Sequence, residues 1–289
     1  MNSPTISEVP FELISSAGDP IRGEIRFPDA SKGSLPVVVI CHSFMAFKNW
    51  GFFPMVASRI AEAGYGVVTF NFSLNGVEEN QNRITNFVKF EQNTFSQEID
   101  DLKMVTDAFQ KNTFEVQCID PATIIFLGHS RGGGVAIVSA AMSDHVKGLV
   151  TWSSISTFDR WSNHQKGIWR KLGYLPLAKN STVSPLRLGI SLLHDLEQHH
   201  EGLEITKAAS RIHIPWLLLH GATDVTVPSR EAEVLYRSAP PASTELVLLD
   251  HIGHLYNAAS EEEDHYQTLT RVLDITIHWL HKHFQKEKT

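Results

Sequence analysis

Short apolar runs alternate with longer, partly polar stretches along most of this chain. Six runs rich in β-branched residues or leucine predict buried strands: 36–41, 66–70, 123–127, 146–152, 216–220 and 245–249. A strand that is apolar on both faces must be covered on both sides, so these runs predict an α/β fold with a mostly parallel sheet flanked by helices.

The segments between these strands carry helical spacing of apolar residues. Helices are predicted at 53–63, 94–112, 135–141, 229–238 and 261–284. The polar stretch 71–90 predicts a loop. Near the N-terminus, 11–14 and 21–27 alternate at period two around 17–20, which predicts a β-hairpin.

Residues 153–211 separate two predicted strands and exceed an ordinary crossover. We interpret them as a lid inserted into one α/β core, which comprises 1–152 and 212–289. Within the lid we expect a hairpin over 172–188 that turns near Asn180-Ser181, with a helix starting at Ser184-Pro185 as the alternative, and a helix over 190–199. Trp161 and Trp169 are candidate substrate-binding residues; packing of the lid against the core is the alternative.

Composition narrows the possible functions. The net charge of −7 offers no basic surface for nucleic acid, and no run of 18 apolar residues predicts a membrane span. The first residues lack the pattern of a signal peptide. Cys41 and Cys118 lie outside any C-x-x-C pair, as expected of reduced thiols in a cytoplasmic protein.

The chain contains 15 histidines, which raises the question of a metal site. His199-His200 and the group at 278–283 lack cysteine or carboxylate partners at zinc spacing. We therefore predict no metal and treat these side chains as solvated histidines on helices.

Gly128-His129-Ser130-Arg131-Gly132 has the G-x-S-x-G pattern of a nucleophile elbow, between a predicted strand and a predicted helix. Such a turn strains the serine backbone and lifts its hydroxyl out of the sheet, and the glycines let the backbones approach. Ser130 is thus the candidate nucleophile; a structural Gly-Ser turn is the alternative.

A serine nucleophile needs a base, and the base needs an acid that orients it. Asp224 follows the predicted strand 216–220 and is the candidate acid, with a turn residue as the alternative. His254 follows the last predicted strand and is the candidate base. His251 could instead be the base and Asp250 the acid. Adjacent side chains generally point in different directions, however, so these two could hardly pair while one of them also reached Ser130.

An oxyanion hole needs two N–H donors. We expect these from the backbone of Arg131, directly after the candidate nucleophile, and of Phe44, in the loop after the strand 36–41, where a simple turn is the alternative. The Arg131 side chain has two interpretations: it contacts a substrate carboxylate or phenolate, or it forms a structural ion pair.

These residues together resemble the α/β-hydrolase superfamily, over nearly the whole chain. The likeness is carried by His42-Ser43-Phe44, Gly128 through Gly133, Gly221 through Asp224 with Pro228, and Gly253-His254. Residues 70–76 and 93–102 look like those of dienelactone-hydrolase-like and cinnamoyl-esterase-like carboxylesterases. The sequence departs from that pattern at Ser43, where glycine is usual, and at Ser130, where dienelactone hydrolases use cysteine.

The resemblance implies a Ser–Asp–His triad, no cofactor, and ester hydrolysis through an acyl-enzyme. We therefore expect a serine esterase that acts on small-molecule esters of small acyl groups or aromatic acids; a homodimer is compatible with the sequence. A serine peptidase or amidase on the same scaffold is one alternative. A non-catalytic binding protein with this fold is the other.

Overall fold

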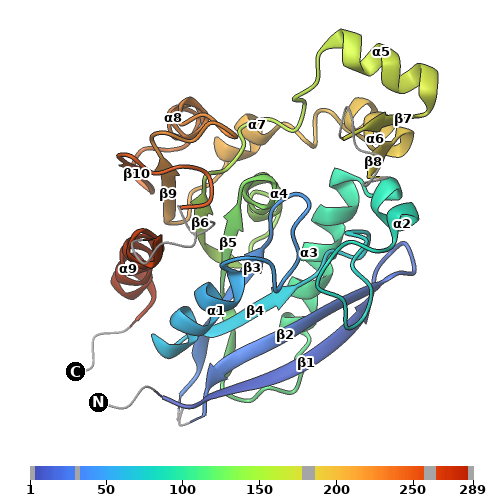
Figure 1. Cartoon of the computed structure of the whole chain (residues 1–289). Coiled ribbons are helices and arrows are strands. Elements are labelled where there is room, and N and C mark those ends of the chain that lie inside the picture. Colours follow the sequence, from blue (N-terminus) through green and yellow to red (C-terminus); the bar gives the residue numbers. More distant parts are fainter. Residues whose placement is uncertain (1–3, 30–32, 178–185, 257–264, 286–289) are drawn as a thin grey trace.

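A mixed sheet of eight strands forms the centre of the molecule (Figure 1). The computed structural model describes residues 4–29, 33–177, 186–256 and 265–285. The strand order is β1-β2-β4-β3-β5-β6-β9-β10. Strands β4, β3, β5, β6, β9 and β10 run parallel, and β1 and β2 pair antiparallel at one edge. The prediction of a mostly parallel sheet is confirmed.

The strands of this sheet are β1 (Ile6–Ile14), β2 (Pro20–Pro28), β3 (Leu35–Cys41), β4 (Gly66–Phe70), β5 (Ile119–His129), β6 (Val146–Trp152), β9 (Trp216–Gly221) and β10 (Thr244–Leu249). The helices are α1 (Phe53–Glu62), α2 (Phe87–Gln92), α3 (Phe95–Gln110), α4 (Arg131–Ala140), α5 (Asn163–Leu172), α6 (Ile190–Gln198), α7 (Ile205–Ala209), α8 (Arg230–Ser238) and α9 (His265–Phe284). A separate two-stranded sheet pairs β7 (Tyr174–Pro176) with β8 (Arg187–Gly189).

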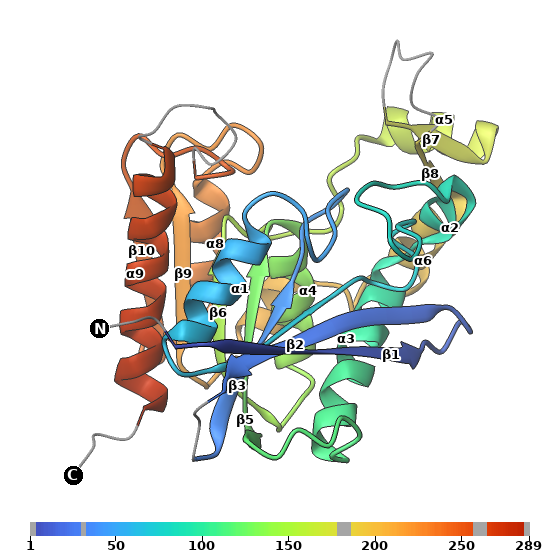
Figure 2. The same cartoon turned by 60° about the horizontal axis from the view of Figure 1, so that its bottom comes forward.

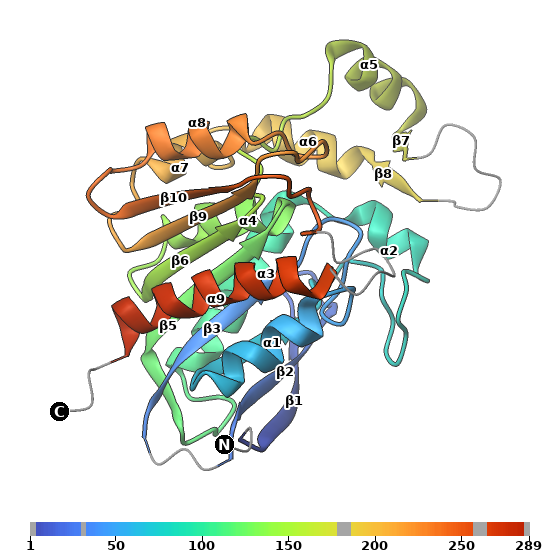
Figure 3. The ribbon, with the colours of Figure 1, turned by 60° about the vertical axis from the view of Figure 1, so that its left-hand side comes forward.

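Helices cover both faces of the large sheet. Val38 and Ile40 of β3 point to the face that α1 and α9 cover, and Figure 3 shows both helices in front of the strands. Val37 and Val39 point to the opposite face, where α3, α4 and α8 pack. The central strands are buried on both sides, which explains why their sequences are continuously apolar.

The N-terminal hairpin is long and forms the antiparallel edge (Figure 2). Its register pairs Phe11 with Gly23. A Cβ atom at Gly23 would lie 2.3 Å from the Phe11 ring and 2.7 Å from the Thr69 carbonyl oxygen. Glycine at this position therefore lets β2 fit between β1 and β4.

Residues 153–211 leave the sheet after β6 and return to it at β9. Within this segment, α5, β7, β8 and α6 lie together at one end of the molecule (Figure 1), and α2 contacts both α6 and β8. In contrast, α7 packs against α4 and α8. The expected hairpin pairing is confirmed by β7 and β8, while its turn near 180–181 and the alternative at 184–185 lie outside the described residues.

Three short helices depart from the sequence prediction. α2 lies partly within the stretch 71–90 that was predicted as a loop, and α5 and α7 were not predicted. α2 has six residues, too few to show a helical period, and it buries only Phe90. The start of α5 does carry a signal, because Ser162 and Gln165 form a capping box.

Candidate active site

Ser130 lies at a sharp turn between β5 and α4. Its backbone has φ 56° and ψ −119°, a conformation that costs a non-glycine residue about 1–3 kcal/mol. A Cβ atom at Gly128 would lie 2.4 Å from the Gly132 carbonyl oxygen. At Gly132 it would lie 2.3 Å from the Cys41 oxygen. Both glycines are thus required for the close approach of backbones that holds the serine in this conformation.

A chain of hydrogen bonds connects Ser130 to two residues from later loops. His254 Nε2 lies 3.0 Å from Ser130 Oγ, and His254 Nδ1 lies 2.7 Å from Asp224 Oδ2. Asp224 follows β9 and His254 follows β10, so the parallel order of these strands brings all three residues to one edge of the sheet. The Asp224 carboxylate can only accept, which leaves the proton on His254 Nδ1 and the Nε2 lone pair facing the serine hydroxyl.

Asp224 is held as an anion by a dense set of donors. Burial alone would raise the pKa of its carboxyl group, but hydrogen bonds from His220 and His254 and from the Val227 N–H hold this pKa well below its usual range. The Thr226 N–H also donates to Asp224, at 2.9 Å. The carboxylate therefore stays charged and can stabilise a protonated His254.

The two competing residues lie elsewhere. Asp250 and His251 are both exposed, although they belong to the same loop as His254. His251 has φ 59°, so the backbone turns at this residue, and it is His254 that lies within hydrogen-bond distance of Ser130. The structure therefore brings His254, and not His251, to Ser130.

His129 is a residue of this site that the sequence analysis did not single out. Its Nε2 lies 3.0 Å from the carbonyl oxygen of His254, and the two rings are 4.8 Å apart. A carbonyl oxygen only accepts, so Nε2 carries the proton. Burial lowers the pKa of His129 to about 3, which keeps the ring neutral. His129 thus anchors the loop that carries His254.

The two expected oxyanion donors come from different elements. Arg131 is the first residue of α4, and Phe44 lies in the loop after β3. Among the described residues, the backbone N–H groups of Phe44 and Arg131 donate no hydrogen bond within the protein. Both groups are therefore available to an oxygen atom bound at Ser130.

A cavity of about 270 Å³ opens beside Ser130 and His254; we call it the site cavity. Most of its wall is apolar, and the other lining residues are Ser43, Phe44, Trp50, Phe95, Arg131, Ile155, Phe158, Arg160, Trp161, Thr226, Val227 and Leu255. Trp161 lies on the wall, whereas Trp169 is fully buried behind it, with the two rings 5.1 Å apart. Of the two tryptophans, only Trp161 can meet a ligand directly in this conformation.

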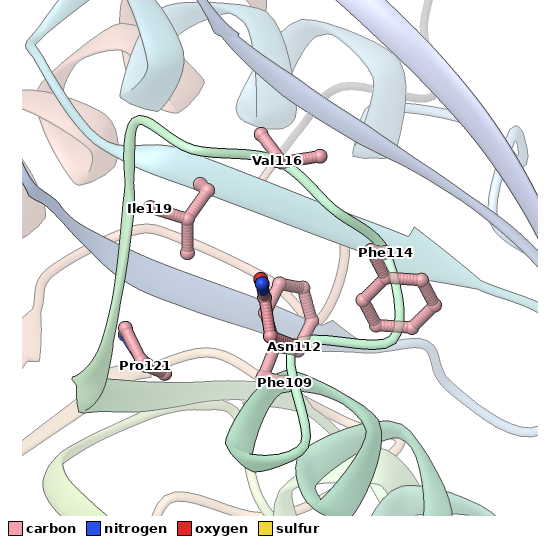
Figure 4. A pocket seen from close by; sticks show the side chains of 6 residues that line it. All are labelled: Phe109, Asn112, Phe114, Val116, Ile119 and Pro121. Atoms are coloured by element: carbon pink, nitrogen blue, oxygen red, sulfur yellow. The ribbon is translucent and has the colours of Figure 1, made fainter.

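A second, very small cavity lies under the loop that precedes β5 (Figure 4). Phe109, Phe114 and Ile119 are among the side chains around it, and its volume is about 10 Å³. Ile119 begins β5 and Ser130 follows its end, so this cavity lies at the opposite end of the strand from Ser130. It has room for about one water molecule and not for an ester.

The described residues lack two kinds of feature. Within residues 4–29, 33–177, 186–256 and 265–285, no group of three or more His, Cys, Asp or Glu side chains is arranged to hold a metal ion. No helix in these same ranges is long and apolar enough to cross a membrane. Cys41 and Cys118 are free thiols, and burial raises the pKa of both.

Comparison with known proteins gives one family and several relatives. Residues 36–174 match the family described as alpha/beta hydrolase fold. A curated relative, 2,6-dihydropseudooxynicotine hydrolase of Paenarthrobacter nicotinovorans, is 24% identical over 243 residues, which cover 82% of this chain. The chain spans 58% of the length of that relative.

Solved structures with the same fold cover nearly the whole chain. The alpha/beta hydrolase GrgF from Penicillium sp. sh18 has a TM-score of 0.75 at 16% identity, over 98% of this chain and 100% of that one. Est1E from Butyrivibrio proteoclasticus, solved with ferulic acid, has a TM-score of 0.70 at 17% identity, over 96% and 100%. At these identities the likeness concerns the fold alone.

Proposed function

We propose that this chain, a member of the α/β-hydrolase superfamily, is a serine hydrolase that cleaves carboxylic esters of small acyl groups or aromatic acids. The observation that carries the proposal is the hydrogen-bond chain from Ser130 through His254 to Asp224. A serine hydroxyl is a weak nucleophile on its own, and this chain is the arrangement that activates it.

In the proposed mechanism, Ser130 Oγ attacks the ester carbonyl while His254 Nε2 takes its proton. Asp224 stabilises the imidazolium that forms. The N–H groups of Phe44 and Arg131 bind the oxyanion of the tetrahedral intermediate, each contributing about 3 kcal/mol. His254 then protonates the leaving alcohol, and water hydrolyses the acyl-enzyme by the same steps in reverse.

The apolar wall of the site cavity supports the choice of substrate. Phe44, Phe95, Phe158 and Trp161 offer aromatic surface to an acyl group. We further propose that residues 153–211 act as a lid over this cavity, because Phe158, Arg160 and Trp161 come from that insertion. The relative named 2,6-dihydropseudooxynicotine hydrolase and the ferulic acid bound to Est1E support a hydrolase acting on small aromatic compounds.

The nucleophile is tested with a fluorophosphonate probe, which reacts with an activated serine. We expect the wild-type protein to be labelled and Ser130→Ala to remain unlabelled. Equal labelling of the two proteins would refute the assignment of Ser130.

The base and the substrate class are tested by turnover. His254→Ala should abolish hydrolysis of p-nitrophenyl acetate, and His251→Ala, an exposed residue of the same loop, serves as the matched control with activity retained. Turnover of aminoacyl naphthylamides above that of simple esters would favour an amidase. Tight ligand binding without turnover would favour a binding protein.

A further inference from the structure

The Arg131 side chain occupies an unusual position in the wall of the site cavity. Its Nε donates a hydrogen bond to Glu98 Oε2 at 2.9 Å, and only 9% of the side chain is exposed. The guanidinium carbon lies 4.4 Å from the centre of the Phe95 ring and 5.1 Å from that of Phe44. The group thus packs against two aromatic rings that also line the cavity.

The two terminal nitrogens of Arg131 find no hydrogen-bond acceptor in the described part of the chain, and Nη2 is buried. A structural ion pair would normally use the fork of the guanidinium to bind both carboxylate oxygens. Glu98 cannot offer both oxygens here, because Oε1 accepts from the Asn93 side chain at 2.7 Å. Arg160, which also lines the site cavity, does contact both carboxylate oxygens of its partner, because its Nη1 donates to Oε1 and Oε2 of Glu231.

The charge around the site cavity indicates which acceptor would suit Arg131. Glu98 already balances the positive charge of Arg131, and Glu231 balances that of Arg160. A substrate carboxylate would add a negative charge close to Glu98. A neutral carbonyl oxygen would accept a charge-assisted hydrogen bond without this repulsion.

We propose that Arg131 is a specificity-determining residue that donates a hydrogen bond to a second, uncharged carbonyl group in the acyl part of the substrate. The preferred substrates would then be oxoacyl esters. The second carbonyl is placed in the acyl part because this part of the substrate lies close to the guanidinium. Of the two proposed donors to the acyl oxygen, Arg131 carries the guanidinium and Phe44 packs its ring against it. This inference rests on the proposed esterase function.

The test compares p-nitrophenyl hexanoate with its 3-oxo, 4-oxo and 5-oxo analogues and with the p-nitrophenyl half-ester of adipic acid. Each kcat/KM is divided by the rate of uncatalysed hydrolysis of the same ester. In the wild type, we expect the best oxo ester to exceed hexanoate by about 10- to 100-fold, the worth of a charge-assisted hydrogen bond. Arg131→Met should reduce this ratio to about one.

Two further variants keep the test informative if Arg131→Met does not fold, and labelling of Ser130 by a fluorophosphonate reports an intact site in each. Arg131→Lys retains the charge without the fork and should lower the ratio. Glu98→Gln keeps an acceptor for Nε but removes the negative charge, so the relative turnover of the adipate half-ester should rise.

The outcomes separate this inference from the proposed function. If wild type hydrolyses hexanoate but shows no preference for an oxo ester, or if the ratio is the same in wild type and the Arg131 variants, the role of Arg131 is refuted and the esterase stands. A preference of the wild type for the half-ester would refute an uncharged acceptor. Absence of both ester turnover and Ser130 labelling would overturn the esterase and this inference together.

Discussion

At the scale of single residues, the candidate site depends on groups whose protonation is set by their neighbours. Asp224 remains an anion because of its donors, and His129 remains neutral because it is buried. His42, after β3, is likewise buried, which lowers its pKa to about 4. Among the described histidines near Ser130, it is His254 that has one nitrogen facing a carboxylate and the other facing the Ser130 hydroxyl.

His129 provides a prediction at this scale. His129→Leu removes the donor to the His254 carbonyl. The unsatisfied oxygen should cost about 1–3 kcal/mol in the stability of the loop that carries His254. We expect kcat for p-nitrophenyl acetate to fall by about tenfold or more, and His129→Gln, whose amide can donate, to recover part of it. Because His129 is neutral above about pH 4, the shape of the kcat–pH profile should not change. A leucine variant with wild-type kcat would contradict the anchoring role.

At the scale of elements, close packing decides which glycines can be replaced. Gly132→Ala places a Cβ atom 2.3 Å from a backbone oxygen of β3, which cannot move aside. We expect the free energy of unfolding to fall by about 1–3 kcal/mol or more, with loss of activity. Gly167→Ala is the matched control, because nothing lies within 4 Å of the added Cβ on the exposed side of α5. It should raise stability by up to about 1 kcal/mol in urea unfolding.

Asp101 connects α3 to the loop that follows β4. Its carboxylate accepts hydrogen bonds from the Ser73 N–H and hydroxyl and from Gln97, and its side chain is fully buried. Burial outweighs these bonds and raises the pKa of Asp101 to about 6. The native state therefore holds this proton more tightly than the unfolded chain does.

This raised pKa predicts how stability depends on pH. Because the native state binds more protons than the unfolded state between about pH 4 and 6, the contribution of Asp101 to stability falls as pH rises through this window. Asp101→Asn removes the titration but keeps an acceptor for Ser73. The free energy of unfolding of the variant, relative to that of the wild type, should therefore rise by on the order of 1–3 kcal/mol between pH 4 and pH 7, as measured by denaturant unfolding. Parallel pH curves for the two proteins would contradict this assignment.

At the scale of the whole molecule, Glu231 on α8 connects the segment after β6 to the helices that flank the sheet. This carboxylate accepts hydrogen bonds from the Ser156 N–H and hydroxyl and from Arg160. Glu231 is buried, with 9% exposure, and the residues that it holds adjoin Phe158 and Trp161 of the site cavity. The position of one cavity wall therefore depends on this contact.

We expect Glu231→Ala to lower the free energy of unfolding by about 1–3 kcal/mol, because it leaves the Ser156 N–H and hydroxyl without their acceptor and removes the partner of the partly exposed Arg160 guanidinium. The KM for aromatic-acid esters should rise as the cavity wall loosens. Glu233→Ala is the control on the same helix: its pair with Arg237 is exposed, so stability should change by less than about 1 kcal/mol. Similar effects of the two substitutions, measured by urea unfolding and ester kinetics, would contradict a role of Glu231 in holding Ser156 and Arg160 in place.

The sequence by itself determined where the core strands and the longer helices lie along the chain, and the turn that carries Ser130. These features are encoded locally, since burial on one or both faces leaves a periodic pattern, and Gly128 through Gly132 are contiguous. The short helices α2 and α7 lacked enough residues to show such a pattern.

Only the tertiary structure decided between His254 and His251, put Trp161 on the cavity wall with Trp169 behind it, and revealed the contact of His129. It also left the terminal nitrogens of Arg131 without an acceptor beside Glu98. The physical reason is that these features depend on the directions of side chains from elements far apart in the chain. Ser130 and His254 are separated by 124 positions, and only the packing of whole strands and helices brings such residues together.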